Sequence, residues 1–366
     1  MATERIFPPL RTSGGDIVDA AGRPVRLLAV NWYGAESEDH VVGGLQAQAL
    51  AAIVRQIPRL GCNAVRLPWS NELVEHDPAV PERAVEANPE LRGRPAMEVF
   101  DEVVRALTSQ QLMVVLDNHN SDALWCCGDD GNDLWYNDRY PESSWLADWE
   151  AMAARYRGNP LVVGADLRNE PRIRATWGGP AATDWRAAAG RGGDAVLSGD
   201  PDLLVIVEGV QYAADLSRAA HLPVELDVPD RVVYSAHDYV WFEPGVTSAE
   251  EWHAQVRPRW AYLTEEPDPQ PLWVGEFGTC NTSPGCVRSA SPADPGLWFE
   301  ALTAFLAGQG AGWAYWPLNG TQSTGAGREW GAAESYGVLN PAWDGFSNEA
   351  LAGRLRELAV TDPEQG

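Results

Sequence analysis

Eight short apolar runs alternate with helical stretches along this chain, and that alternation limits the folds open to it. Helical spacing lies between the runs at 45–60, 96–110, 143–157, 183–197, 249–263 and 294–308. The runs are rich in Val, Leu, Ile and aromatic residues and occupy 23–32, 63–69, 112–119, 161–170, 203–209, 231–239, 272–278 and 312–320. Several are almost continuously apolar, as strands are when helices cover both faces of a sheet. Eight β-then-α units that close on themselves predict an α/β fold, the (β/α)8 TIM barrel.

A doubly wound open sheet is the alternative α/β arrangement. Such sheets usually carry a Gly-rich phosphate loop after the first strand, whereas here that strand leads into NWYGAESEDH, without a GxGxxG pattern. The length of 366 residues would allow two domains, but no linker, repeat or low-complexity tract divides the chain. We therefore predict a single domain over 1–366, with an N-terminal β-hairpin at 15–28 that turns at AAGR and could plug the amino-terminal end of the barrel.

The charge balance excludes several classes of partner and reaction. With 52 acidic against 27 basic residues the net charge is -25, which would repel a nucleic acid backbone and an anionic membrane surface. Every basic residue is an arginine, so enzymes that need a Schiff-base lysine are excluded. No apolar run approaches the roughly 20 residues of a membrane span.

We expect a monomer that is secreted. The first residues lack the apolar core of a signal peptide, so on this expectation the leader is absent from this chain. A cytoplasmic protein is the alternative.

Polar residues collect where the predicted strands end, and in a barrel of this type the active site is built from those carboxyl ends. Glu170 ends GADLRNE and Glu276 ends LWVGE, both after apolar runs in which an unpaired carboxylate would be costly to bury. Two carboxylates facing each other across the barrel mouth suit glycoside hydrolysis, since one protonates the leaving oxygen while the other attacks the anomeric carbon or activates water. A separation of about 5 to 5.5 Å would mean retention of configuration, and about 6.5 to 9.5 Å inversion.

Six strand-end motifs, taken in order and at their intervals, resemble glycoside hydrolase family 5, the cellulase family. They are NAVRLPW, LDNHN, GADLRNEP, AHDY, WVGEFG and GWAYWPLNG, and the resemblance covers residues 16 to 345. It implies a retaining double displacement with Glu170 as acid/base and Glu276 as nucleophile, and needs no metal or cofactor. It also implies that Asn169 bonds the sugar 2-hydroxyl, and that Trp316 lies under the sugar.

The predicted substrate-binding set is larger than Asn169 and Trp316. Arg66 and Tyr239 are expected to hold Glu276 ionised, while Glu170 must carry a proton to act as an acid. His119 and His237 are expected to bind hydroxyls or to orient the carboxylates. The full predicted substrate-binding set is Arg66, His119, Asn120, Asn169, His237, Tyr239, Trp316 and Trp32.

The expected substrate is an oligo- or polysaccharide, most simply a β-1,4-glucan cut in endo mode. Loops at 121–141, 279–296 and 319–336 could close the cleft, so an exo-acting or disaccharide-releasing enzyme on β-glucosides, β-mannosides or glycolipids is an alternative. A carbohydrate-binding barrel without turnover is another, although a lectin needs neither carboxylate. A metal-dependent barrel hydrolase is disfavoured by the six histidines, which include no HxH pair.

Structural roles compete with functional ones at several positions. Glu208 also ends a strand and is expected to be structural or to support the site. The histidines could be satisfied core groups, and Asn169 could cap a turn. Five tryptophans fall in or near rim loops and are candidates for sugar contact, namely Trp32, Trp125, Trp135, Trp177 and Trp241.

Five cysteines leave at least one thiol outside any intrachain disulfide. Cys280 and Cys286 flank a turn-rich loop in which a disulfide could form, and this would fit an oxidising compartment. Cys126 and Cys127 are adjacent, and neither spacing matches a structural zinc site. Calcium is an alternative for the acidic loop after the third strand, through Asp129, Asp130 and Asp133, but the order departs from that of an EF-hand.

Overall fold

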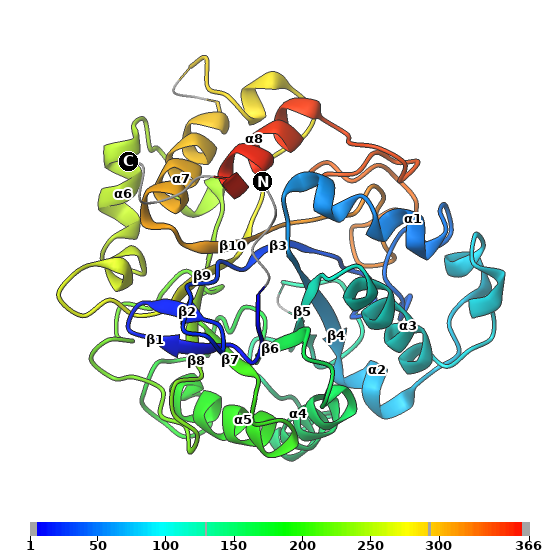
Figure 1. Ribbon diagram of the computed structural model, residues 1–366, viewed down its shortest axis with the longest axis horizontal. Coiled ribbons are helices and arrows are strands. Elements are labelled where there is room, and N and C mark those ends of the chain that lie inside the picture. The colour runs from blue at the N-terminus through cyan, green and yellow to red at the C-terminus, as the bar shows by residue number, and fades with distance from the viewer. Residues whose placement is uncertain (1–5, 129, 292–293, 361–366) are drawn as a thin grey trace.

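A closed barrel of eight parallel strands forms the centre of the computed structural model, which describes residues 6–128, 130–291 and 294–360 (Figure 1). The strands follow one another around the barrel in the order β10-β3-β4-β5-β6-β7-β8-β9. Their bounds are β3 (Leu28–Asn31), β4 (Ala64–Ser70), β5 (Met113–Asn120), β6 (Val162–Asp166), β7 (Leu204–Glu208), β8 (Val232–Asp238), β9 (Leu272–Phe277) and β10 (Gly312–Tyr315). All eight predicted strands are present, and the predicted TIM barrel is confirmed.

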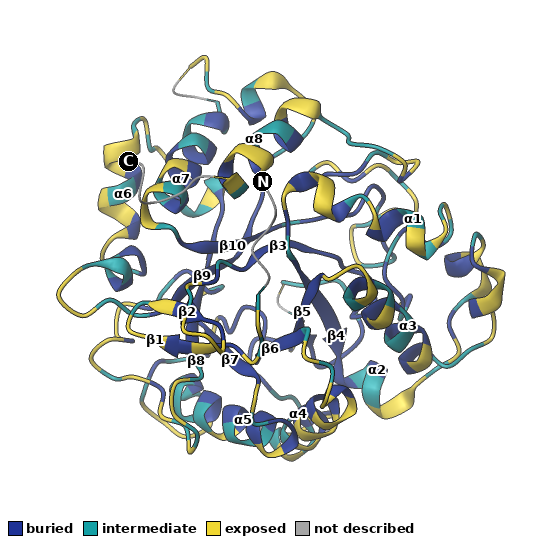
Figure 2. Cartoon of the chain, viewed as in Figure 1, coloured by how far each residue is buried: buried dark blue, intermediate teal, exposed yellow. Residues whose placement is uncertain are grey.

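Helices surround the barrel, with their inner faces buried and their outer faces exposed (Figure 2). They are α1 (Leu50–Val54), α2 (Asn71–His76), α3 (Ala96–Ser109), α4 (Glu142–Tyr156), α5 (Trp185–Gly199), α6 (Ala249–Val256), α7 (Gly296–Gln309) and α8 (Glu349–Val360). Short 3-10 segments are η1 (Ile57–Leu60), η2 (Glu82–Val85), η3 (Pro89–Leu91), η4 (Val240–Phe242), η5 (Ala261–Thr264) and η6 (Pro284–Cys286).

Two predicted helices are broken by proline. The predicted helix over 45–60 is α1 followed by η1, which carries Pro58, and the one over 249–263 is α6 followed by η5, with Pro258 between them. Proline lacks the backbone N–H that an α-helix needs and clashes with the preceding turn. The final helix, α8, was not predicted, although its buried leucines at 351, 355 and 358 have helical spacing.

Two apolar clusters hold the barrel together. One lies between strands and helices and includes Val65, Val114 and Val205. The other fills the amino-terminal part of the barrel and includes Met113 and Leu204. In β5 the apolar residues alternate between the two clusters, with Val114 and Leu116 in the first and Met113 and Val115 in the second.

An N-terminal hairpin closes the amino-terminal end of the barrel, as predicted, but its turn lies elsewhere. β1 (Arg11–Ser13) pairs antiparallel with β2 (Asp16–Val18), so the chain turns at 14–15, where Gly14 has φ +58°. Glycine adopts that conformation without steric cost, which fixes the register there. The AAGR segment forms a second turn, bridged by Val18 and Pro24. Ile17 packs into the lower barrel cluster.

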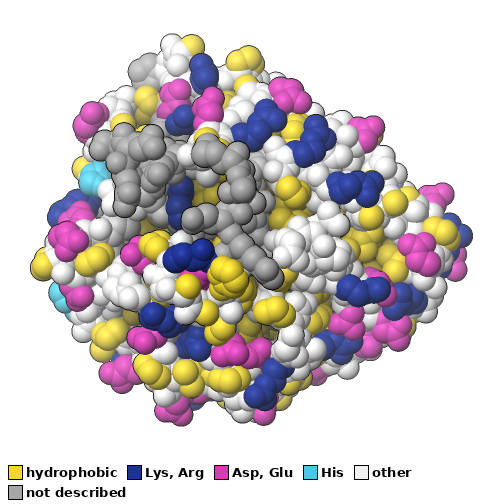
Figure 3. Space-filling model, in the orientation of Figure 1, with side chains coloured by type: hydrophobic (Ala, Val, Ile, Leu, Met, Phe, Trp, Pro, Cys, Tyr) yellow, Lys and Arg dark blue, Asp and Glu magenta, His cyan; other side chains and the backbone are white. Residues whose placement is uncertain are grey.

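The surface carries mixed charge. Arginine and acidic side chains are interspersed across the face shown in Figure 3. Within the described ranges, no helix combines the length and the apolar character that crossing a membrane would require.

Candidate active site

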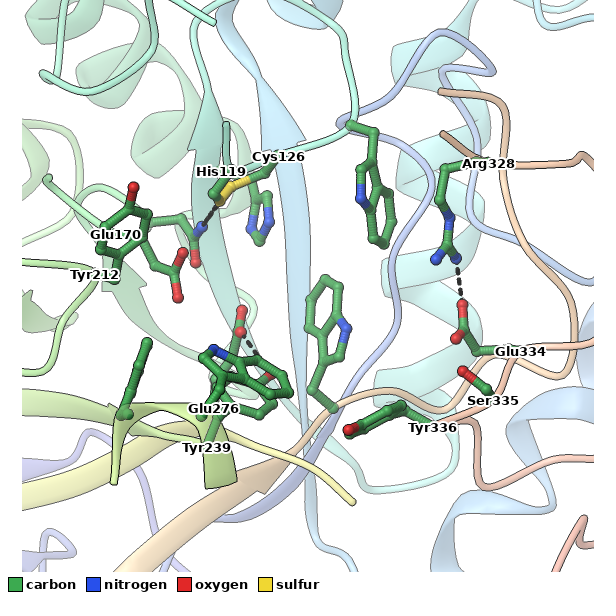
Figure 4. A pocket seen from close by; sticks show the side chains of 16 residues that line it. His119, Cys126, Glu170, Tyr212, Tyr239, Glu276, Arg328, Glu334, Ser335 and Tyr336 are labelled. Carbon is green, nitrogen blue, oxygen red and sulfur yellow. Dashed lines mark hydrogen bonds and ion pairs between the residues drawn. A yellow bond between two sulfur atoms is a disulfide. The ribbon is translucent and has the colours of Figure 1, made fainter. Parts of the chain in front are cut away.

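A cavity of about 570 Å³ opens at the carboxyl ends of the strands (Figure 4). Strand ends, the 3-10 segment η4 and three loop segments, at 125–127, 212 and 328–336, contribute to its wall. It is lined by His119, Trp125, Cys126, Cys127, Asn169, Glu170, Tyr212, Tyr239, Trp241, Phe242, Glu276, Trp316, Arg328, Glu334, Ser335 and Tyr336. Six of the ten residues predicted for the site are therefore brought to one cavity.

The two predicted catalytic carboxylates face each other inside it. Glu276 lies in β9, and Glu170 follows the end of β6 by four residues. One carboxylate oxygen of each, together with a ring nitrogen of His237, lie within 4.8 Å of one another. Nδ1 of His237 is 3.1 Å from Oε1 of Glu170 and 3.6 Å from Oε2 of Glu276. This spacing is close to that of retaining glycosidases and well short of the roughly 6.5 to 9.5 Å of inverting ones.

Arg66 lies beneath the cavity, fully buried, and binds four carboxylates. Its guanidinium is 3.0 Å from Asp117, 2.8 Å from Asp166, 2.8 Å from Glu208 and 2.9 Å from Glu276. Burial disfavours its charge, but these carboxylates outweigh burial and raise the pKa of Arg66. One cation thus holds the ends of β5, β6, β7 and β9 in fixed relation.

Both oxygens of Glu276 are held. Arg66 Nη1 lies 2.9 Å from Oε1, and the Tyr239 hydroxyl donates to Oε2 at 3.0 Å. Burial raises the pKa of Glu276, and the charges on His237 and Arg66 oppose that rise without cancelling it. The expected contacts from Arg66 and Tyr239 are therefore present, but the net direction of the pKa is upward because desolvation is the larger effect.

The backbone at Glu170 is held in an unusual conformation. Its φ is +48°, which side-chain-bearing residues rarely adopt, and its N–H donates to Oε2 of Glu208 at 2.6 Å. His237 and Arg66 lower the pKa of Glu208 although burial works against them. Glu208 therefore has the supporting position expected of it, because it anchors the peptide that carries Glu170.

Asn169 precedes Glu170 and is held at both ends of its amide. Its Oδ1 accepts from Arg66 Nη2 at 3.0 Å, and its Nδ2 lies 3.4 Å from Sγ of Cys126 and 3.5 Å from Sγ of Cys127. Oδ1 is thus bonded to a guanidinium, whereas a turn cap would bond it to a backbone N–H. The two N–H groups of Nδ2 contact only the sulfurs among the described residues, and these are weak acceptors.

Two groups of stacked aromatic rings contribute to the cavity wall. Trp316 stacks on Tyr33, with centroids 5.2 Å apart, and on His119 at 5.5 Å. Nδ1 of His119 is 2.7 Å from Asp117, and although burial would lower the pKa of His119, the carboxylates around it raise it. Tyr239 and Trp241 also line the cavity and stack on each other, with centroids 4.4 Å apart. Flat apolar faces of this kind match the C–H faces of a sugar ring.

Two predicted substrate-binding residues are placed away from the cavity, and these predictions are corrected. Asn120 is fully buried and donates to the carbonyl of Leu124, so it holds the following loop. Trp32 is also fully buried, and its Nε1 donates to the carbonyl of Gly43. Strand-end position alone predicted both, but alternate residues of a strand point to opposite faces. Arg66 and His237 lie behind the cavity wall and act on it through the carboxylates.

Several lining residues were not in the predicted site. Of the rim tryptophans, Trp125 and Trp241 line the cavity, while Trp135 and Trp177 are buried in packing. The remaining unpredicted lining residues are Cys126, Cys127, Tyr212, Phe242, Arg328, Glu334, Ser335 and Tyr336. They come from loops and, for Phe242, from η4, where no strand periodicity marks them, and only the aromatic composition of 121–141 gave an indication. Of the loops expected to close the cleft, 121–141 and 319–336 contribute to its wall, and the described residues of 279–296 do not.

Two disulfides are present, one at the expected pair Cys280 and Cys286 and one at Cys126 and Cys127, for which no bond was predicted. Cys280 bonds to Cys286, Cys126 bonds to Cys127, and Cys62 is a buried free thiol. Among the described side chains, two groups have spacing that could hold a metal ion: Glu170 with His237 and Glu276, and Cys126 and Cys127 with Glu170. The cysteines of the second group cannot supply thiolates while they are bonded to each other.

In the acidic loop after β5, the predicted calcium ligands Asp130 and Asp133 form ion pairs with arginines. Asp130 accepts from Arg172 at 2.8 Å, and Asp133 pairs with Arg174 at 2.6 Å. The third predicted calcium ligand, Asp129, lies outside the described residues. The two described carboxylates are thus already neutralised by guanidinium groups.

Comparison with known proteins gives a consistent family. The family model described as cellulase (glycosyl hydrolase family 5) matches residues 18–322. An endoglucanase of Paenibacillus polymyxa is 34% identical over 378 residues, covering 97% of this chain and 88% of that protein. The major extracellular endoglucanase of Xanthomonas campestris is 40% identical over 195 residues, covering 53% of this chain and 39% of its own length.

Solved structures agree with the sequence relatives. The catalytic domain of the major endoglucanase from Xanthomonas campestris superposes with a TM-score of 0.81 at 29% identity, covering 96% of this chain and all of that one. An endocellulase from Pyrococcus horikoshii, solved as a complex with cellotetraose, gives 0.81 at 25% identity, covering 97% of this chain and all of that one.

Proposed function

Since this chain belongs to glycosyl hydrolase family 5, the cellulase family, and is a glycoside hydrolase, we propose that it is an endo-β-1,4-glucanase-like enzyme with a retaining mechanism. The observation that carries the proposal is the pair of glutamates in one cavity, with carboxylate oxygens within 4.8 Å of each other. The endoglucanase and endocellulase relatives support the choice of β-1,4-glucan as substrate.

Glu276 is the nucleophile in this proposal. Arg66 and Tyr239 fix both of its oxygens, so one of them can be directed at an anomeric carbon. Attack forms a covalent glycosyl-enzyme, and its carboxylate charge is lost in the ester. That loss removes a negative charge close to Glu170.

Glu170 is the general acid and then the general base. Its Oε1 is held by His237, and its carboxyl group faces the cavity, where the leaving oxygen would lie (Figure 4). It donates a proton in the first step and, once the charge on Glu276 has been lost, takes one from water in the second. Asn169 would bond the 2-hydroxyl, and Trp316 would lie under the ring.

The proposal is tested by two substitutions and two product assays. Glu276→Ala and Glu170→Ala should each reduce turnover of a soluble β-1,4-glucan by at least about a thousandfold, because catalytic groups of this kind supply several kcal/mol. Glu98→Gln, a carboxylate change on the outer face of α3, is the matched control and should leave turnover unchanged. Proton NMR should show the β-anomer as first product, whereas an α-anomer would contradict retention.

Endo action is tested separately. A rapid fall in viscosity for few new reducing ends indicates internal cleavage. Release of only glucose or only cellobiose from the start would instead favour an exo-acting or disaccharide-releasing enzyme.

We also propose that one domain spanning 1–366 acts as a secreted monomer. The two disulfides support an oxidising compartment, where such bonds persist. Light scattering on the purified chain should give the mass of one copy, and a value near twice that mass would contradict the monomer.

A further inference from the structure

The disulfide between the adjacent residues Cys126 and Cys127 forms part of the cavity wall. Both residues are half-buried, so solvent and substrate can reach them, and both line the cavity with Glu170. Their sulfur atoms and a carboxylate oxygen of Glu170 lie within 4.8 Å of one another. Figure 4 shows the sulfur bridge in the cavity wall near His119 and Glu170, with a dashed line joining it to a neighbouring amide. A reducible bond thus lies beside Glu170.

The amide that contacts the bridge is Asn169. Arg66 fixes Oδ1, while Nδ2 contacts the two sulfurs at 3.4 and 3.5 Å. A disulfide has no hydrogen to donate, and its sulfurs are weak acceptors. These weak contacts orient the amide. They can be exchanged, at a small cost in free energy, for a hydrogen bond to a stronger acceptor such as a sugar hydroxyl. An oxygen acceptor in the same place would compete with the sugar.

We propose that the Cys126–Cys127 disulfide is a positioning element of the cleft, which aims Asn169 at a substrate hydroxyl, and that its reduction lowers turnover. This inference rests on the proposed function. Reduction by a small dithiol begins with thiolate attack on one sulfur, which forms a mixed disulfide and releases the other cysteine. The second thiol of the reductant then closes its own disulfide and releases the first cysteine. The reductant loses two electrons, and two protons end on the cysteine sulfurs.

Reduction to two free thiols changes the surface that Nδ2 of Asn169 contacts. Unbonded sulfurs separate to van der Waals distance, so they can no longer both contact Nδ2 in the same place. Each also gains an S–H group, which can donate to the carboxylate of Glu170. Asn169 keeps its bond to Arg66 but loses the support that sets the direction of Nδ2.

The chain contains a matched control. Cys280 and Cys286 also form a disulfide, but neither lines the cavity, and Cys62 is a buried thiol in the apolar core. The double variant Cys280→Ser/Cys286→Ser therefore keeps the vicinal bridge as its only disulfide within the described part of the chain. Any response of that variant to a dithiol comes from Cys126 and Cys127.

The experiment measures kcat and KM on a soluble β-1,4-oligosaccharide before and after treatment with dithiothreitol, with the thiols counted by alkylation and mass spectrometry. Reduction of the wild type should lower kcat/KM roughly three- to tenfold, the worth of one neutral hydrogen bond. The loss should fall mainly in kcat, because the hydroxyl contact strengthens in the transition state. Reoxidation should restore it. The Cys280→Ser/Cys286→Ser variant should respond as the wild type does, and Cys126→Ala/Cys127→Ala should not respond.

Asn169→Ala distinguishes positioning from a general structural effect. If the bridge acts through Asn169, reduction of Asn169→Ala should cause no further loss, so the two effects are not additive. Full additivity would overturn the inference, and so would unchanged kcat/KM in wild type whose Cys126 and Cys127 are fully alkylated after reduction. Absence of turnover by the oxidised wild type is a different result, which would remove the proposed function and this inference with it.

Discussion

The protonation of Glu276 depends on neighbours that act in opposite directions. Burial raises its pKa, while His237 and Arg66 favour the charged form. In the proposed mechanism Glu276 is the nucleophile and must be ionised, so activity should fall as the pH drops through this raised pKa. We therefore predict that the acid limb of kcat/KM lies above about 4.3, the ordinary value for Glu. A pH profile on a substrate with a good leaving group measures it, and a limb at or below that value would contradict the prediction.

Tyr239→Phe should shift that limb further. The hydroxyl of Tyr239 donates to Oε2 of Glu276, so its removal takes a hydrogen bond from the charged form. The acid limb should move to higher pH, and kcat/KM at its optimum should fall at least about tenfold, as expected for a lost bond to a charged group. An unchanged limb would show that the hydroxyl does not stabilise the carboxylate.

Packing between neighbouring helices depends on single small residues. On α5, a Cβ added at Gly192 would lie 2.2 Å from the ring of Trp145 on α4. Alanine favours a helix over glycine, but here the clash should dominate. Gly192→Ala should reduce the free energy of unfolding by about 1 to 3 kcal/mol, the usual cost of overpacking.

Gly308 on α7 provides the matched comparison, since a Cβ there meets nothing within 4 Å. Gly308→Ala should increase stability by about 0.5 to 1 kcal/mol. Urea unfolding of both variants measures the two changes. Equal effects would mean that helix propensity, not the contact with Trp145, decides the outcome.

A buried carboxyl on α4 makes stability depend on pH. Burial raises the pKa of Asp148 from 3.8 to about 6, while Asn71 on α2 donates to it at 2.7 Å. Because the folded-state pKa is the higher one, the stability that Asp148 contributes is present below about pH 4 and is lost as the pH rises through about 6.

Asp148→Asn removes that dependence. Relative to wild type, the variant should gain about 1 to 3 kcal/mol of unfolding free energy between pH 4 and pH 8, the value of a shift of about two pKa units. Denaturant titrations at both pH values test this. A difference between variant and wild type that stays constant with pH would contradict it.

Closure of the barrel at its amino-terminal end involves the whole molecule. Leu10, beside the hairpin, is 1% exposed and packs with the lower barrel cluster, at the opposite end from the cavity. Leu10→Ala should cost about 2 to 4 kcal/mol, as for other buried leucines, while kcat/KM well below the melting temperature stays unchanged. The neighbouring exposed residue gives the control, since Arg11→Ala should change stability by less than about 0.5 kcal/mol. Loss of activity in folded Leu10→Ala would contradict the separation of the two ends.

Local pattern was enough to predict the strands and most helices. Runs such as 112–119 and 272–278 are apolar enough to be buried whatever surrounds them, so their structure follows from composition. Failures occurred where one residue alters the backbone, as Gly14 does in the hairpin and Pro58 does in the first predicted helix. The motifs at Glu170 and Glu276 located the paired carboxylates because they end strands that meet at one face of the barrel.

The sequence by itself determined the barrel and the family, since both depend on residues whose spacing along the chain repeats or matches. Tertiary structure alone decided which side chains reach the cavity. It buried Asn120 and Trp32, and it brought Trp125 and the Cys126–Cys127 bridge to the wall from one loop and Arg328 from another. The physical reason is that periodic burial acts within one element, whereas the direction of a loop is set by contacts between residues far apart in the chain.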